Sequence, residues 1–155
     1  MKTNRTRSGF TLVEILIVVI ILGILAAIVI PQFTNASTDA RKSSMLSQLQ
    51  TLRSQVQLFK LQHNDVLPDL ITNQWTQLTS KTNLAGTVDT TATGLYGPYL
   101  ESDPVNPLNS KKTVAAAAGA NVGWTYSTTG AQAGVLFATN QDPTKPFDEN
   151  TGVVQ

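Results

Sequence analysis

GFTLVEILIVVIILGILAAIVIP, residues 9–31, is the stretch that decides the fold. From Ile15 to Ile30 every residue is apolar except Gly23. Counted from Phe10 to Ile30, the run has a length of about 31 Å as an α-helix at 1.5 Å per residue, which matches the hydrocarbon thickness of a bilayer. The run therefore predicts a membrane-spanning helix.

The charges beside this run are one-sided. Three basic residues precede it, Lys2, Arg5 and Arg7, and no basic residue follows it until Arg41. Because basic flanks stay in the cytoplasm, this pattern predicts a cytoplasmic N-terminus and a C-terminal part on the other side of the membrane. A cleaved secretory signal fits less well, since its apolar core is usually about 7–15 residues long and ends at a small-x-small site.

One acid, Glu14, lies inside the apolar run. A charged side chain within the bilayer costs about 2.5–3.5 kcal/mol on insertion scales, so it is by default a candidate functional residue. The alternative is that Glu14, one helical turn from the edge, extends its carboxylate to the lipid–water interface. Taken alone, the residue leaves both interpretations open.

The sequence GFTLVE at residues 9–14, after a short basic leader and before an apolar helix, resembles the type IV prepilin signature. That family covers pilins and the pseudopilins of type II secretion systems. The resemblance implies cleavage after Gly9 by a membrane prepilin peptidase, followed by N-methylation of Phe10. It also implies that Glu14 pairs with the Phe10 amine of a neighbouring subunit during assembly. Pro31 falls where these proteins commonly carry a proline.

A second apolar pattern follows at helical spacing. It predicts an amphipathic helix over residues 32–63 whose apolar stripe covers a sheet. Pro31 predicts a kink or a break, because an internal proline costs a helix about 3 kcal/mol. The helix is expected to end near His63, ahead of Pro68. The apolar stripe consists of Met45, Leu49, Leu52, Val56 and Phe59.

Residues 64–155 hold six of the seven prolines and eight of the ten glycines, which is typical of loops and short strands. Residues 75–78 predict a helical turn, and residues 122–126 with 133–137 predict a β-hairpin. The alanine-rich run at 115–120 is too short to assign. The expected fold class is α+β, with a long N-terminal helix packed on a small antiparallel β-sheet, the pilin fold that the resemblance implies.

The second half narrows the resemblance to the major pseudopilins of type II secretion. GPYL at residues 97–100, a proline-rich stretch, a Trp/Tyr strand and a second strand follow one another as in that group. Two departures stand out: DPVNPLN at 103–109 replaces a Pro-Lys-Asp-Pro-Trp-Gly-type run, and residues 111–121 look like an insertion. The chain has no cysteine, whereas major pilins of adhesive pili often close a C-terminal loop with two. This difference favours a pseudopilin.

No catalytic pattern is present in the sequence. His63 is the only histidine, and no G-x-S-x-G, zinc-binding or phosphate-binding motif occurs. A lone histidine at a helix end more often caps the helix than catalyses. The chain also lacks the clustered Lys and Arg with aromatics between them that a nucleic-acid interface needs. We therefore expect neither an enzyme nor a nucleic-acid-binding protein.

The acids of the C-terminal tail are the candidate metal ligands. Asp142, Asp148 and Glu149 carry the hard oxygen atoms that Ca²⁺ prefers, and the major pseudopilins are associated with a calcium site in their C-terminal loops. The spacing of these acids matches no ligand template, and acids in a polar tail are usually solvated. Calcium is the one candidate cofactor.

The resemblance implies four parts: a leader at residues 1–9, a transmembrane and filament-core helix at 10–31, an amphipathic helix at 32–63, and a β-sheet and loop region at 64–155. The expected function is a structural subunit of a type II secretion pseudopilus. It would cross the bacterial inner membrane once, with its C-terminal domain in the periplasm, and polymerise in the cell envelope after cleavage and methylation.

The expected partners are further copies of the chain, the prepilin peptidase and methyltransferase, the inner-membrane assembly platform, minor pseudopilins and the lipid bilayer. Two alternatives remain open. One is a type IV pilin for adhesion, motility or DNA uptake, and the other is a signal-anchored extracytoplasmic binding domain.

Overall fold

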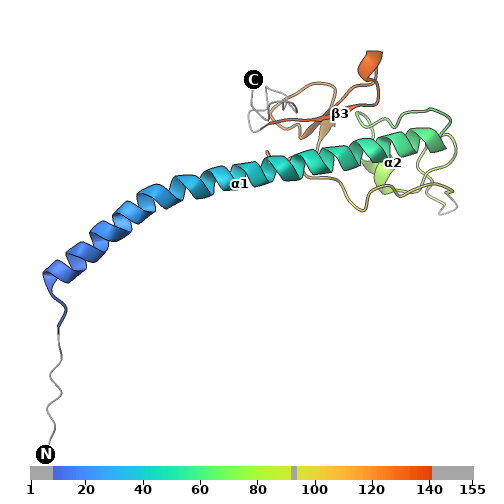
Figure 1. Cartoon of the computed structure of the whole chain (residues 1–155). Coiled ribbons are helices and arrows are strands. Elements are labelled where there is room, and N and C mark those ends of the chain that lie inside the picture. The colour runs from blue at the N-terminus through green and yellow to red at the C-terminus, as the bar shows by residue number, and fades with distance from the viewer. Residues whose placement is uncertain (1–8, 92–93, 141–155) are drawn as a thin grey trace, which may run out of the picture. The chain divides into compact units, whose positions relative to one another are not determined.

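The structure, a computed structural model, describes residues 9–91 and 94–140 of the chain. The chain divides into two compact units, Met1–Asp39 and Ala40–Gln155. The class is α+β, as predicted. The elements in chain order are α1 (Leu12–Gln62), α2 (Thr76–Thr79), β1 (Val114–Ala115), β2 (Trp124–Tyr126), a 3-10 turn (Gly130–Gln132) and β3 (Leu136–Ala138) (Figure 1).

The first unit contains the apolar part of α1. The large apolar side chains from Leu12 to Ile30 are between 41% and 82% exposed, so they cover no core of their own. α1 is long and apolar enough to cross a bilayer. A helix that is apolar on every side is stable in lipid or among other apolar helices. The predicted apolar helix is therefore confirmed as an element of the fold.

Pro31 lies inside α1, and the helix is continuous on both sides of it. Of the kink or break expected at this residue, the break is therefore wrong, and the kink stays a prediction. A proline removes one N–H donor and strains a single turn, whereas every other residue of a long helix adds a main-chain bond. Close by, the Thr34 hydroxyl donates to the carbonyl of Ile30 at 3.1 Å.

The second unit is built around the apolar stripe of α1. The five predicted stripe residues are each at most 1% exposed, and they form one cluster with the tryptophans and with the sheet. Figure 1 shows α2 and β3 beside this half of α1. α1 ends at Gln62, close to the predicted end, where Asn64 and Asp65 adopt positive φ angles of 53° and 64°. The stripe covers the sheet, as predicted.

β2 and β3 form the predicted antiparallel hairpin, in which Trp124 lies opposite Ala138 and Tyr126 opposite Leu136. The predicted helical turn at residues 75–78 is also present, as α2.

The sheet is mixed, which corrects the expectation of a purely antiparallel sheet. β1 pairs with β2 in parallel, with Val114 opposite Trp124. The main-chain carbonyl of Thr113 accepts from both Gly123 N at 2.9 Å and Trp124 N at 3.1 Å. The segment 111–121, read from sequence as an insertion, therefore contains a strand. A two-residue strand beside a run of alanines has too little alternation to be recognised.

Candidate functional site

The start of α1 is organised by Thr11 and Glu14. Glu14 Oε2 accepts two hydrogen bonds from Thr11, one from the main-chain N at 2.8 Å and one from Oγ1 at 2.7 Å. In return, Glu14 N donates to Thr11 Oγ1 at 3.3 Å. This reciprocal arrangement of a Thr and the Glu three residues later is a capping box. It satisfies main-chain donors at the helix start that have no carbonyl partner inside the helix.

The capping box gives Glu14 a fixed place at the N-terminal end of α1, where the helix dipole favours a negative charge. Sequence reasoning identified Glu14 but missed Thr11. The signal was available as the T-x-x-E spacing of TLVE at residues 11–14. The carboxylate therefore caps an apolar helix, and it is also a negative charge that a cation can approach.

Gly9 and Phe10 precede α1 and are open to an approaching protein. The Phe10 side chain is 81% exposed, and a Cβ added at Gly9 would meet no atom within 4 Å. The Gly9–Phe10 peptide bond lies one turn before Glu14, so cleavage there would place a new amine close to the carboxylate. The structure brings these three residues together at one helix end. Pro31, the third candidate assembly residue, lies about 26 Å further along the helix at 1.5 Å per residue, outside this group, and its part in assembly stays a prediction.

His63 closes the other end of α1 and is fully buried. Its Nδ1 lies 2.7 Å from the carbonyl oxygen of Phe59, and its Nε2 lies 3.0 Å from Thr82 Oγ1. Because a carbonyl can only accept, Nδ1 carries a hydrogen in the first of these contacts. The ring also stacks on Phe59 with centroids 3.9 Å apart. These contacts fit the interpretation of His63 as a helix-end residue.

The predicted calcium ligands Asp142, Asp148 and Glu149 lie outside the described residues. Within residues 9–91 and 94–140, no group of three or more His, Cys, Asp or Glu side chains is placed to hold a metal ion. Calcium binding by the tail therefore stays a prediction.

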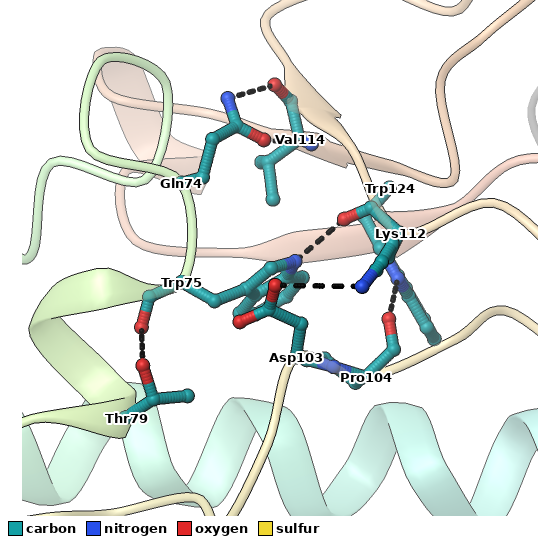
Figure 2. A network of polar contacts seen from close by, with 8 residues as sticks. All are labelled: Gln74, Trp75, Thr79, Asp103, Pro104, Lys112, Val114 and Trp124. Carbon is teal, nitrogen blue, oxygen red and sulfur yellow. Dashed lines mark hydrogen bonds and ion pairs between the residues drawn. The ribbon is translucent and has the colours of Figure 1, made fainter.

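Two buried tryptophans hold the loops of the second unit in place (Figure 2). The Trp75 indole N–H donates to the carbonyl of Lys112, and the Trp124 indole N–H donates to the carbonyl of Pro104 at 3.1 Å. Gln74 also binds both main-chain groups of Val114, at 3.0 Å and 2.7 Å. Sequence reasoning missed these pairings, although a buried indole usually needs an acceptor. They fix the proline-rich segment and β1 to the core.

The comparisons with known proteins agree with the geometry at the start of α1. Residues 4–30 match a family model described as the prokaryotic N-terminal methylation motif. The chain is 38% identical over 61 residues to the type II secretion system core protein G of Dickeya chrysanthemi. The aligned residues make up 39% of this chain and 40% of the relative. The corresponding protein of Pseudomonas aeruginosa is 40% identical over 58 residues, covering 37% and 41%.

A likeness to a pilin also exists. The type IV major fimbrial protein FimA of Dichelobacter nodosus is 43% identical over 51 residues, covering 33% of each chain. The chain thus matches less than half the length of each of these relatives. No solved structure matches it. The resemblance to the type IV pilin-like proteins, and to the major pseudopilins among them, is confirmed.

Proposed function

We propose that the chain is a structural subunit of a type II secretion pseudopilus and is not an enzyme. The observation that carries this proposal is the combination at the start of α1, where a capped carboxylate, Glu14, stands at the head of a helix that is apolar and exposed on all sides. Such a helix needs lipid or other apolar helices around it. In a subunit that first lies in a membrane and then packs into a filament core, this helix is surrounded first by lipid and then by other apolar helices.

The first step of this function is processing at the membrane surface. The open position of Gly9 and the exposure of Phe10 support cleavage between them by a prepilin peptidase and methylation of the new Phe10 amine. The match to the N-terminal methylation motif supports the same step. Methylation leaves the amine basic, so the mature chain carries a cation one helical turn from Glu14.

The second step is assembly. When a subunit enters the apolar filament core, its Glu14 carboxylate loses water, and an unpaired buried charge is strongly penalised. The Thr11 capping bonds reduce this penalty but supply no positive charge. The Phe10 amine of an adjacent subunit supplies the missing cation. Docking in the correct register is therefore favoured over docking that leaves Glu14 unpaired.

The three basic residues before α1 support an orientation with the N-terminus in the cytoplasm and the second unit in the periplasm. In this proposal the partners are further copies of the chain, the prepilin peptidase and methyltransferase, the inner-membrane assembly platform and minor pseudopilins. The filament then drives folded proteins through an outer-membrane pore.

The substitution Glu14→Leu tests this function. We expect the variant to enter the membrane and to be cleaved after Gly9, yet to form no filaments, because loss of one buried charge partner typically costs about 3–5 kcal/mol. The measurement counts filaments by electron microscopy on overexpression, alongside the precursor and mature bands. The matched control is Val18→Leu, one turn further along the same helix. Normal filament numbers from the Glu14 variant would show that the carboxylate only reaches the interface.

A type IV pilin is the second candidate, and the likeness to the fimbrial protein of Dichelobacter nodosus favours it specifically. Deletion of the gene separates the two. Loss of export of folded proteins with surface pili retained supports the pseudopilus, whereas loss of pili with export retained supports the pilin.

A further inference from the structure

β1 is an edge strand of the described sheet, whose strand order is β1-β2-β3. The carbonyl of Thr113 accepts from Gly123 N and Trp124 N, so the main chain of Thr113 faces β2. Because main-chain groups of a strand alternate in direction, those of Lys112 and Val114 face the outer side. The unpaired outer edge of a strand offers N–H and C=O groups to a strand of another molecule.

Two consecutive side chains, those of Gln74 and Trp75, bind these outer groups (Figure 2). Gln74 Oε1 accepts from Val114 N at 2.7 Å, and Gln74 Nε2 donates to Val114 O at 3.0 Å. The Trp75 indole N–H donates to the carbonyl of Lys112. An amide side chain has one acceptor and one donor group, so Gln74 makes with Val114 the same exchange of bonds that a residue of a neighbouring strand would make.

The backbone of Gln74 lies in the left-handed region, with a φ angle of 51°. This conformation is strained for a residue with a Cβ atom, and glycine adopts it without strain. The side chain is held in place by a further bond, from Nε2 to the carbonyl of Ile71 at 2.9 Å. A strained residue whose side chain makes three bonds indicates that the side chain has a role of its own at this position.

The other edge strand, β3, has a similar contact. Val135 O and Thr139 N bond to the residues that flank β2, so the main chain of Leu136 faces the opposite side. Arg53 Nε and Nη2 donate to the Leu136 carbonyl at 2.9 Å and 2.7 Å. Within residues 9–91 and 94–140, each edge strand of this sheet therefore has a side chain bound to its outer main-chain groups.

We propose that Gln74 closes the outer edge of β1 against the β1 strand of a second copy of the chain. A second copy fits this edge because it carries the same edge, and two identical strand edges can pair in antiparallel orientation about a twofold axis. The residues directly after β1, Ala116 and Ala117, are small and exposed, so no large side chain keeps a second strand away. The inference concerns the second unit alone and does not depend on the pseudopilus proposal.

The absence of cysteine from the chain allows a crosslinking test. Ala116→Cys places a reporter thiol beside β1 in the full chain in detergent, and a short bismaleimide joins thiols of neighbouring molecules. Paired strands lie about 4.8 Å apart, so paired β1 edges bring the two thiols within reach of the crosslinker. We expect Gln74→Gly to raise the yield of crosslinked dimer about fivefold or more over the reporter alone, because it frees the edge. An unchanged yield would overturn the proposal.

Two controls show whether the association is at the edge. Asn64→Gly also replaces an exposed residue of positive φ, 53°, but in the turn after α1, and it should leave the dimer yield unchanged. Ser44→Cys, an alternative reporter on the exposed face of α1, measures association through the helix. Gln74→Gly should not change the yield at this second reporter. An equal rise at both reporters would contradict the proposal, since it would show general association of the molecules.

A third comparison separates an open edge from a loosened core. Leu52→Ala leaves Gln74 in place and, below its unfolding midpoint by tryptophan fluorescence, should give the dimer yield of the Ala116→Cys reporter alone. Gln74→Glu keeps the length of the side chain but puts a negative charge at the edge, and like charges on paired strands repel. Its dimer yield at pH 8 should be about threefold or more below that of Gln74→Gly. Equal yields from the two Gln74 variants, or the same rise from Leu52→Ala, would overturn the proposal.

Discussion

The two halves of α1 differ in how their apolar side chains are used. In the first half, Leu25 is 53% exposed, and large apolar residues occur all around the helix. In the second half, Leu52 is 1% exposed, and apolar residues follow a narrow stripe against the protein's own core. The same secondary structure therefore depends on two different surroundings. The first half depends on a partner outside the chain, and the second half depends on the fold of the chain itself.

The largest effect is expected at the head of the first half. Gly9→Val should abolish cleavage of the leader while membrane insertion proceeds, because a peptidase must approach the backbone closely and glycine has no side chain in its way. A Cβ at this position has open space, so the chain itself tolerates the change. Mass spectrometry should find residues 1–9 still attached, and methylated Phe10 at the N-terminus of the wild type. A variant that matures at Phe10 would contradict the prepilin interpretation.

A matched pair of leucine truncations separates the two halves most directly. Leu52→Ala should lower the free energy of unfolding of the second unit by about 2–5 kcal/mol, because it leaves a cavity in the core. Leu25→Ala should change that free energy by less than about 0.5 kcal/mol. Denaturant unfolding of the full chain in detergent, followed by tryptophan fluorescence, measures both. Equal losses from the two variants would remove the distinction between the halves.

A smaller effect is expected from a buried polar group on β2, in the core that the second half of α1 covers. The Tyr126 side chain is 1% exposed, and its hydroxyl has no hydrogen-bond partner among residues 9–91 and 94–140. Burial, and then the charge of Asp69, raise the pKa of Tyr126 to about 12. The folded pKa lies above the unfolded value near 10, so this contribution to stability is complete below pH 10 and is lost as the pH rises toward 12.

Tyr126→Phe should therefore be neutral or stabilise the unit by up to about 1 kcal/mol at pH 8, since it removes an unpaired hydroxyl without leaving a partner unsatisfied. Between pH 10 and 12 the variant should lose less stability than the wild type. Thermal midpoints at pH 8 and pH 11 measure the difference. A variant that is clearly less stable at pH 8 would show that the hydroxyl has a bonding partner.

The smallest effect is expected from calcium. If the tail acids Asp142, Asp148 and Glu149 hold a calcium ion, chelation should lower the thermal midpoint of the full chain, because a ligand of the native state stabilises it by mass action. A midpoint that calcium titration leaves unchanged would contradict the metal site. A midpoint that rises on calcium titration would assign Asp142, Asp148 and Glu149 to a metal site.

Much of the fold could be predicted because its signals are local. The stripe from Met45 to Phe59, the turn at α2 and the β2–β3 hairpin each repeat a pattern within a few residues, at period 3.6 or 2. The candidate site was predictable for the same reason, since Gly9, Phe10 and Glu14 lie in one short motif.

The features that were missed depend on contacts between distant parts of the chain. β1 is defined only by its pairing with β2, and Trp75 is fixed by the carbonyl of Lys112, 37 residues later. Thr11 is an exception, because its T-x-x-E signal is local.

The distance between Val56 and Leu136 along the chain has a consequence for biosynthesis. The core needs both the stripe of α1 and the last strands, and Asn106 joins those strands through bonds to the carbonyls of Gly123 at 2.7 Å and Thr139 at 2.8 Å. At about 5–20 residues per second, the ribosome needs about 4–16 s to add the roughly 80 residues between Val56 and Leu136. During that interval the stripe has no sheet to cover, so the core of the second unit forms only after its last strands have been made.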